Sequence, residues 1–304
     1  MNDTALVETS KNTKKKKISS ENLWGWLFIA LPVFGTSFFV FFPLLMAIYA
    51  SFTSWSAMVP LFDAKFVNFD NYIKFFTDEH IRETLFNTVF YMIGIPINVI
   101  LSLLLAICMN RPIKFANTFR VIFYIPVVAS VVSITLLFSR LFDINGVVNR
   151  FLRIFGMSEI KWSNGPAWLK KITITIMLVW KGLGGSILLF IAGLQGVNKN
   201  YFEAAKLDGA GDVKIFFKIT LPQLYPVIFY IVITLFIGGA QIYTEPALFY
   251  PNAGYDVMPL VLYLYNQQFA YKAGYSAAIG IMLGIMVFIV TAIQFYINKR
   301  KSEN

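Results

Sequence analysis

The stretch EAAKLDGAGDVKIFFKITLP, which runs from Glu203 to Pro222, is a polar interruption in the apolar second half of the chain. Good helix formers precede Gly209 and Gly211, and these glycines stop a helix because glycine adopts the left-handed conformation at little cost. Asp212 suits the N-cap of a second short helix. The stretch therefore predicts two short helices joined by a glycine turn, with Pro222 marking the start of the next segment.

The side chains of this loop suit contact with another surface. Ala204 and Ala205 leave one flank of the first helix smooth, so that a second surface can approach its backbone closely. Apolar and basic side chains surround that flank: Phe202, Phe216, Phe217, Lys206, Lys214 and Lys218. These residues alone leave two interpretations open, docking onto another protein or contact with an anionic lipid surface.

The composition of the 304-residue chain indicates a membrane protein with several spans. Hydrophobic residues make up 57% of the chain and charged residues only 14%, whereas soluble domains carry about 25% charged residues. The single cysteine and the single histidine, Cys108 and His80, exclude an internal disulfide and metal sites built from several Cys or His ligands. No P-loop motif is present, so we expect no P-loop nucleotide site and no cofactor.

Six segments are apolar and long enough to cross a bilayer, which takes about 20 residues. Their expected ranges are 23–51, 85–109, 119–141, 172–194, 227–244 and 277–297. Lys14–Lys17 precede the first segment as they would in a signal peptide. The apolar run of this segment is much longer than a signal-peptide core, so we expect a retained membrane span.

Basic residues between the segments predict their orientation. Lys14–Lys17, the short connection Arg111–Arg120 and the tail Lys299–Lys301 all fall on the same side of the membrane. Because lysine and arginine accumulate on the cytoplasmic side, both termini and the Glu203–Pro222 stretch are expected there. The loops expected on the outer side are 52–84, 142–171 and 245–276.

The spacing of the opening stretch resembles the EAA loop of ABC-importer permeases. That loop has the pattern Glu-Ala-Ala, three residues, Gly, nine residues, Ile, one residue, Leu-Pro. This chain fills the pattern without a gap, with Glu203, Ala204, Ala205, Gly209, Ile219, Leu221 and Pro222. In that family the loop is the coupling helix, which docks in a groove of the ATP-hydrolysing subunit, so the resemblance favours protein docking over lipid contact.

The resemblance extends over about residues 24–298. It is to the carbohydrate branch of the family and, within it, to the first of two permease subunits, similar to maltose- and glycerol-phosphate-type permeases. The supporting stretches are FFPLLMAIYASFTSW (Phe41–Trp55), FDNYIKFF (Phe69–Phe76), FRVIFYIPVVAS (Phe119–Ser130), WKGLGGSILLFIAGLQGV (Trp180–Val197) and AGYSAAIGIML (Ala273–Leu283). The chain departs from the family's Gly-Gly-Pro after the fifth span, where it reads FYPNAGYDVMP (Phe249–Pro259).

The resemblance implies an all-α membrane protein with the type I ABC-importer permease fold. Six transmembrane helices would form one domain over residues 23–298, with the coupling loop at 198–222. Residues 1–22 would form a disordered cytoplasmic N-terminus, and residues 299–304 a cytoplasmic tail. The implied location is a bacterial cytoplasmic membrane.

The resemblance also implies a function and a set of partners. The chain would carry a sugar, as an oligosaccharide or sugar derivative, together with a second permease subunit, two cytoplasmic ATP-binding subunits and an extracytoplasmic solute-binding protein. ATP hydrolysis would lie in the partner, so the chain itself is not expected to be an enzyme. The alternative is a stand-alone secondary transporter or channel, which would have no use for a coupling loop.

Polar residues within the spans predict where the sugar binds, because such residues are costly unless they face protein or water. Glycines interrupt the fourth span after Trp180 and the fifth span before Gln241, and resemblance to maltose-type permeases places sugar contacts in these segments. An aromatic face covers the apolar side of a sugar ring, and a glutamine both donates and accepts hydrogen bonds. The candidates are Trp180, Lys181, Gly182, Thr234, Gly238, Gln241, Tyr243 and Glu245.

Structural explanations for the same residues stay open at this point. Lys181 and Glu245 could form an ion pair that only joins two helices, and Trp180 could be a packed aromatic. Gly182, Gly184 and Gly185 also suit close packing between membrane helices, which small residues permit.

Overall fold

The computed structural model describes residues 20–111, 114–251 and 254–302, and divides them between a first unit, Met1–Tyr49, and a second unit, Ala50–Asn304. In the first unit, α1 (Ser20–Thr36) and the π-helical segment η1 (Ser37–Phe41) lead into α2 (Phe42–Ser51). The predicted disordered N-terminus lies outside the described residues, apart from residues 20–22, which begin α1.

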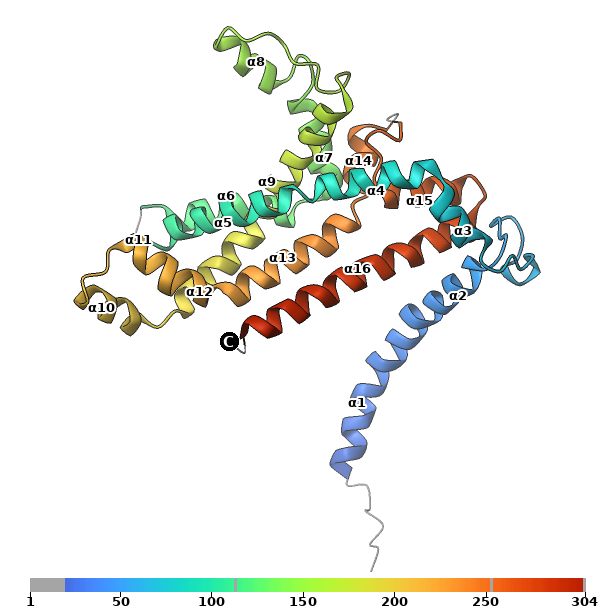
Figure 1. The fold of residues 1–304 in the computed structure, drawn as a ribbon, viewed down its shortest axis with the longest axis horizontal. Helices are drawn as coiled ribbons and strands as arrows, with labels where there is room; N and C mark the ends of the chain where they lie inside the picture. Colours follow the sequence, from blue (N-terminus) through green and yellow to red (C-terminus); the bar gives the residue numbers. More distant parts are fainter. Residues whose placement is uncertain (1–19, 112–113, 252–253, 303–304) are drawn as a thin grey trace, which may run out of the picture. The chain divides into compact units, whose positions relative to one another are not determined.

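The second unit is helical, and its described residues contain no strand beyond an isolated bridge between Thr53 and Phe66. Its elements are η2 (Leu61–Asp63), α3 (Asp70–Thr77), α4 (Glu79–Tyr91), α5 (Gly94–Asn110), α6 (Ala116–Val128), α7 (Val131–Leu141), α8 (Val147–Ile154), α9 (Ala167–Gly196), α10 (Lys199–Leu207), α11 (Asp212–Ile215), η3 (Phe216–Thr220), α12 (Leu221–Gln223), α13 (Tyr225–Ala240), α14 (Thr244–Phe249), α15 (Leu260–Phe269) and α16 (Ala273–Ser302). Helices α10 and α11 lie at one end of this unit, and α3 and α15 at the other (Figure 1).

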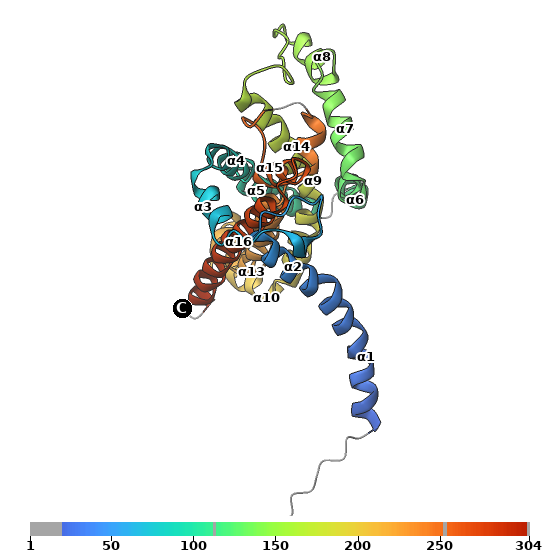
Figure 2. The ribbon, with the colours of Figure 1, turned by 90° about the vertical axis from the view of Figure 1, so that its right-hand side faces the viewer.

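The prediction of six spans agrees with the helices if each of two bent pairs counts as one span. Long apolar helices cover Trp24–Ser51, Glu79–Asn110, Ala167–Gly196 and Ala273–Arg300. The bent pairs are α6 with α7, at 105°, and the segment Asp212–Gln223 with α13, at 61°. Figure 2 shows α7 turning away from α6 toward α8.

Two of the expected spans differ from a single straight helix. The third breaks at Ala129 and Ser130, whose ψ angles of 151° and 130° are extended. Pro126, three residues before Ala129, has no backbone N–H to donate. The fifth ends at Ala240 instead of residue 244, because Gln241 leaves the helical conformation with φ −105° and ψ 14°. Hydropathy gives the length of an apolar run but not its bends.

Helix α9 is the centre of the second unit and packs against α5, α6 and α13. The apolar core on this helix is built around Phe190 and Ile187, which are fully buried. Phe123 of α6 and Ile231 of α13 pack into the same cluster. The glycines of α9 bring neighbouring backbones close: a Cβ on Gly184 would lie 2.1 Å from the carbonyl oxygen of Phe123.

Replacing Gly184 with alanine is expected to destabilise the protein, because α6 would have to move away from α9. Overpacking of this kind costs about 1–3 kcal/mol. Gly185→Ala is the matched control, since nothing lies within 4 Å of a Cβ at that position. Thermal melting of the purified variants checks the prediction, and equal melting temperatures for the two variants would contradict the close approach.

Candidate substrate cavity and coupling loop

A cavity of about 540 Å³ opens in the second unit between α4, α5, α9, α13 and α14. Seven of the eight predicted substrate residues line it, although they come from segments far apart in the sequence. They are Lys181, Gly182, Thr234, Gly238, Gln241, Tyr243 and Glu245. The fold therefore brings the two glycine-interrupted segments together around one space, while their contact with a sugar stays a prediction.

The break after α13 explains how these side chains reach the cavity. Helix α13 ends at Ala240, and the backbone N–H of Gln241 bonds to the carbonyl oxygen of Gly238. The chain then turns back into the short helix α14, so that Gln241, Tyr243 and Glu245 follow one another along the wall. Broken helices of this kind place polar backbone and side chains at a cavity inside the membrane.

Trp180 is the predicted residue that does not line the cavity. Its ring packs against Phe138, with the ring centres 5.1 Å apart, at the edge of an apolar cluster that includes Phe142. Its predicted sugar contact stays a prediction. Tyr243 is an aromatic residue of the cavity wall, and its ring packs against that of Tyr265 with the ring centres 4.4 Å apart.

An ion pair joins α9 to α14 in the cavity wall. The Nζ of Lys181 lies 2.7 Å from Oε1 of Glu245. The Glu245 side chain is 9% exposed and that of Lys181 27% exposed, so the pair is largely shielded from solvent. The pair joins α14 to α9, and both residues also line the cavity. Their contact with a sugar stays a prediction.

Asn98 also lines the cavity, although it was not among the eight predicted substrate residues. Its side-chain amide donates to the carbonyl oxygen of Val179 at 3.0 Å and its Oδ1 accepts from Ser186 Oγ at 2.8 Å. A Cβ on Gly182 would lie 2.8 Å from the Asn98 amide nitrogen, so glycine at position 182 makes room for this side chain. The polar residue within an apolar span was the signal that could have found it.

The glycine turn in the coupling loop forms as predicted. Gly209 has φ +73°, in the left-handed region, at the end of α10. The N-cap of the second helix is Gly211 rather than Asp212, which is the first helical residue. The predicted N-cap lies one residue C-terminal to the observed one, because glycine caps a helix nearly as well as aspartate does.

The second helix of the loop is anchored to the core. Helical segments α11, η3 and α12 run on from Asp212 to Gln223, and Phe216 and Leu221 pack against the apolar cluster of α9. Ile219 is half-buried and Pro222 is exposed. The bend before α13 is fixed by Leu224, which is fully buried.

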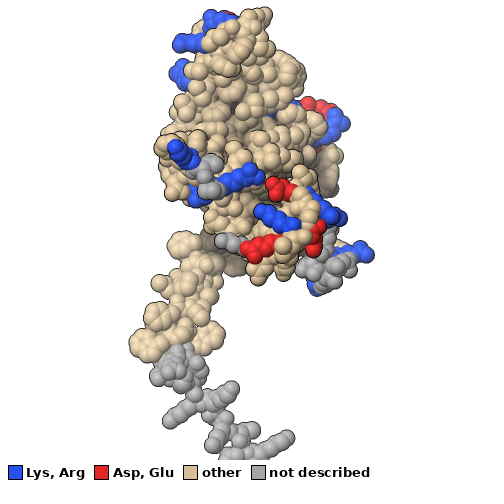
Figure 3. Space-filling model, turned by 90° about the vertical axis from the view of Figure 1, so that its left-hand side faces the viewer, with Lys and Arg blue, Asp and Glu red and all other residues tan. Residues whose placement is uncertain are grey.

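The first helix of the loop projects from this anchor. Glu203 and Ala204 are exposed and Ala205 is half-buried. Leu207 is 89% exposed, and Val213 and Phe217 are exposed as well. Figure 3 looks at this end of the second unit and shows lysine, arginine and acidic side chains gathered on it. Exposed apolar side chains ringed by charge are typical of a surface that contacts another protein.

The chain matches a known family model and known proteins. The model of the family described as "Binding-protein-dependent transport system inner membrane component" matches residues 83–303. The chain is 31% identical over 300 residues to the lactose transport system permease protein LacF of Rhizobium radiobacter, covering 96% of this chain and 98% of that protein. It is 35% identical over 267 residues to the arabinooligosaccharides transport system permease protein AraP of Bacillus subtilis, covering 86% and 84%.

The fold matches a chain of a bacterial alginate ABC transporter in complex with an alginate pentasaccharide-bound periplasmic protein. The TM-score is 0.80 at 18% identity, and the match covers 93% of this chain and 96% of the other. A second alginate importer structure gives a TM-score of 0.77 at 20% identity, with coverage of 91% and 98%. The predicted all-α permease fold is confirmed.

Proposed function

The chain belongs to the family of binding-protein-dependent transport system inner membrane components, and from this premise we propose that it is the permease subunit that moves a sugar. It is the transmembrane permease subunit of an ABC importer. The proposed substrate is an oligosaccharide or a sugar derivative. Relatives named for lactose and arabinooligosaccharides support this substrate class.

The observation that carries the proposal is the composition of the cavity wall. A cavity of about 540 Å³ has the volume of ordinary small-molecule sites, which is about 300–1,000 Å³. Its wall includes the aromatic side chain of Tyr243, the side-chain amide of Gln241 and the Lys181–Glu245 ion pair. A sugar needs this combination, because its ring faces are apolar and its edge carries hydroxyl groups.

The partners follow from the same premise. We propose that the chain pairs with a second permease subunit, that two cytoplasmic ATP-binding subunits power it, and that an extracytoplasmic solute-binding protein delivers the sugar. The ATP-binding subunit would dock on Glu203–Leu207 and the exposed Val213. ATP hydrolysis would then lie outside this chain.

Helix α13 provides a direct mechanical connection between the proposed docking surface and the cavity. Helix α12 joins α13 through Leu224, and the far end of α13 carries Thr234, Gly238 and Gln241 into the cavity wall. A rotation of α11 and α12, driven by closure of the ATP-binding subunits, would move this wall. The cavity would thereby switch between outward and inward access.

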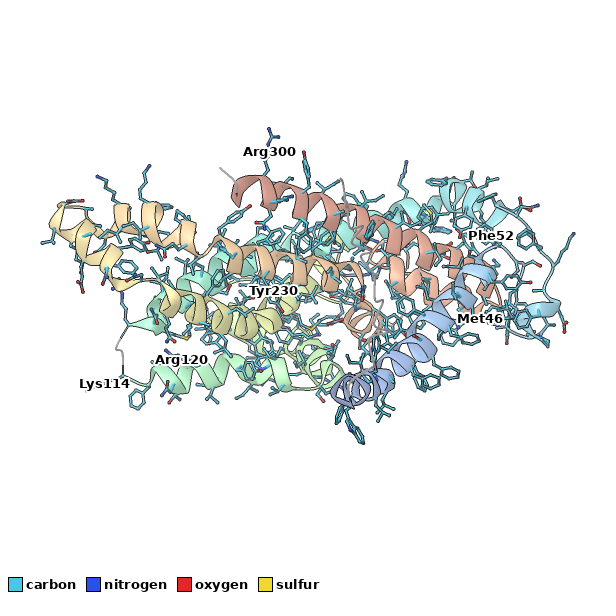
Figure 4. All side chains as sticks on the ribbon, turned by 90° about the horizontal axis from the view of Figure 1, so that it is seen from below. Met46, Phe52, Lys114, Arg120, Tyr230 and Arg300 are labelled. Carbon is cyan, nitrogen blue, oxygen red and sulfur yellow. The ribbon has the colours of Figure 1, made fainter. Side chains whose placement is uncertain are left out.

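The chain is a multi-pass protein of the cell membrane. We propose that both termini and the coupling loop are cytoplasmic. Lys114 and Arg120 lie at the end of the second unit that carries α10, and Phe52 lies at the other end (Figure 4). The C-terminal end of α16 lies on the α10 side as well (Figure 1). Together with Lys14–Lys17 in the sequence, these basic residues support the proposed cytoplasmic side.

Gln241→Ala tests the sugar-binding role of the cavity. Loss of one or two hydrogen bonds of about 0.5–1.5 kcal/mol each is expected to reduce ATP-driven sugar uptake about fivefold to tenfold. Gln195→Ala, an exposed position outside the cavity wall, should transport normally. The measurement is uptake of the binding protein's sugar into proteoliposomes that contain the complete transporter. Normal uptake by Gln241→Ala, with unchanged sugar preference, would place selectivity in the binding protein alone.

A further inference from the structure

A second pocket, of about 450 Å³, lies at the end of the second unit opposite α10. It is formed by α3, the start of α4, α15 and the connection between α15 and α16. Lys74, Asp78, His80, Tyr263 and Lys272 are among the residues that line it. None of these residues belongs to the substrate cavity or to the coupling loop.

The carboxylate of Asp78 is fully engaged within the protein. Its Oδ2 accepts hydrogen bonds from the hydroxyls of Tyr263 at 2.6 Å and Tyr275 at 2.7 Å, and its Oδ1 accepts from the backbone N–H of His80 at 3.1 Å. Burial alone would raise the pKa of Asp78, but these hydrogen bonds outweigh it and hold the pKa below its usual value. Asp78 is therefore ionised, and tyrosines rather than lysines satisfy it.

Two ammonium groups share the pocket with the Asp78 carboxylate. Neither Lys74 nor Lys272 forms an ion pair within the described parts of the chain. The Nζ of Lys74 lies over the ring of Tyr275, 4.2 Å from its centre. Burial and, after it, the positive charge of Lys272 lower the pKa of Lys74, against an opposing effect of Asp78. An anion placed between the two lysines would remove their mutual repulsion.

Exposed apolar side chains lie close to the two lysines in the sequence. Ile73 and Phe76 flank Lys74 in the sequence and are exposed, and Phe269 and Tyr271, just before Lys272, are exposed as well. Phe75, whose ring contacts that of Phe76, is buried in the core. Amphipathic helices with exposed aromatic and aliphatic side chains beside lysines are typical of the membrane interface, where the lysines reach lipid phosphates.

We propose that this pocket binds the phosphodiester headgroup of an anionic phospholipid. The phosphate oxygens accept hydrogen bonds from the ammonium groups of Lys74 and Lys272. The stacked rings of His80 and Tyr255, with centres 3.6 Å apart, form one wall beside the headgroup. The acyl chains cover Phe76 and Phe269. This occupant fits better than an acidic side chain of another protein, because the segments that carry the two lysines also expose Phe76, Phe269 and Tyr271.

Native mass spectrometry of the complete transporter tests the proposal. The purified complex is delipidated and titrated with phosphatidylglycerol, and in parallel with phosphatidylcholine, whose headgroup has no net charge. Lys74→Gln and Lys272→Gln are each expected to weaken phosphatidylglycerol retention about fivefold, the effect of one lysine near an anionic surface, and the double variant more. Lys161→Gln removes the same charge from an exposed loop position outside the pocket and should retain lipid as the wild type does.

Three results would overturn the lipid assignment. In the first, the double variant retains phosphatidylglycerol as well as the wild type does. In the second, inorganic phosphate alone stabilises the wild type but not the double variant, with no preference between the two lipids, which would make the pocket a site for a free anion. In the third, the double variant keeps its lipid but loses affinity for the solute-binding protein, which would make the pocket a protein contact.

Discussion

Gly209→Val is expected to abolish ATP-driven uptake while the protein still inserts into the membrane and assembles. Gly209 has φ +73°, a region that β-branched residues adopt only with strain. Valine would force the turn after α10 open and move Leu207 and Glu203 away from their proposed position against the ATP-binding subunit. The connection from that subunit through α12 to the cavity would then be lost.

Gly211→Val is the matched control for this substitution. Nothing lies within 4 Å of a Cβ at either glycine, so the two valines differ in backbone strain and not in crowding. Gly211 has φ −71° and ψ 160°, which is extended backbone that valine readily adopts. ATPase activity of the reconstituted transporter should be stimulated by loaded binding protein in Gly211→Val but not in Gly209→Val. Normal stimulation in both variants would rule out the turn as the coupling element.

Lys181→Met is expected to destabilise the protein strongly. It leaves the carboxylate of Glu245, 9% exposed, without its cation, and breaking a buried ion pair in this way costs about 3–5 kcal/mol. The variant should melt at a much lower temperature than the wild type, and its sugar uptake should fall. The double variant Lys181→Met/Glu245→Gln should recover much of the stability, because the second change removes the unpaired charge.

Arg153→Met provides the comparison at the surface. Arg153 pairs with Glu159 at 3.4 Å, with side chains 47% and 42% exposed, and pairs of that kind contribute about 0–1 kcal/mol. Its removal should leave the melting temperature nearly unchanged. If Lys181→Met is as harmless as Arg153→Met, or if the double variant is no more stable than Lys181→Met alone, the pair does not hold α14 against α9.

The coupling loop was predictable from the sequence because its geometry is local. A glycine just past the last helical residue commonly takes a left-handed conformation, so the turn at Gly209 could be expected from the spacing alone. The exposure of Leu207 could not be predicted from the sequence. Whether an apolar residue beside the turn folds back onto the core or projects from it depends on how α11 and α12 pack against α9.

The cavity was predictable in its residues but not in all their orientations. Interrupted spans and polar residues identified the two segments that meet, and seven candidates line one space. Trp180 and Lys181 are neighbours on α9, and successive residues of a helix point about 100° apart. Which of the two faces the cavity depends on the rotation of α9, which packing against Phe138 and Phe123 fixes.

The most direct test of the coupling account is photocrosslinking from position 207. Leu207→Cys in a Cys108→Ser background leaves a single thiol, to which a benzophenone maleimide is attached in the complete transporter. Illumination should produce an adduct between this chain and the ATP-binding subunit, and the thiol should resist an impermeant reagent applied outside intact cells. The same probe at Asn164→Cys, in the 142–171 loop, should give no such adduct. An active transporter in which position 207 fails to crosslink to the ATP-binding subunit, or is labelled from outside, would contradict the account.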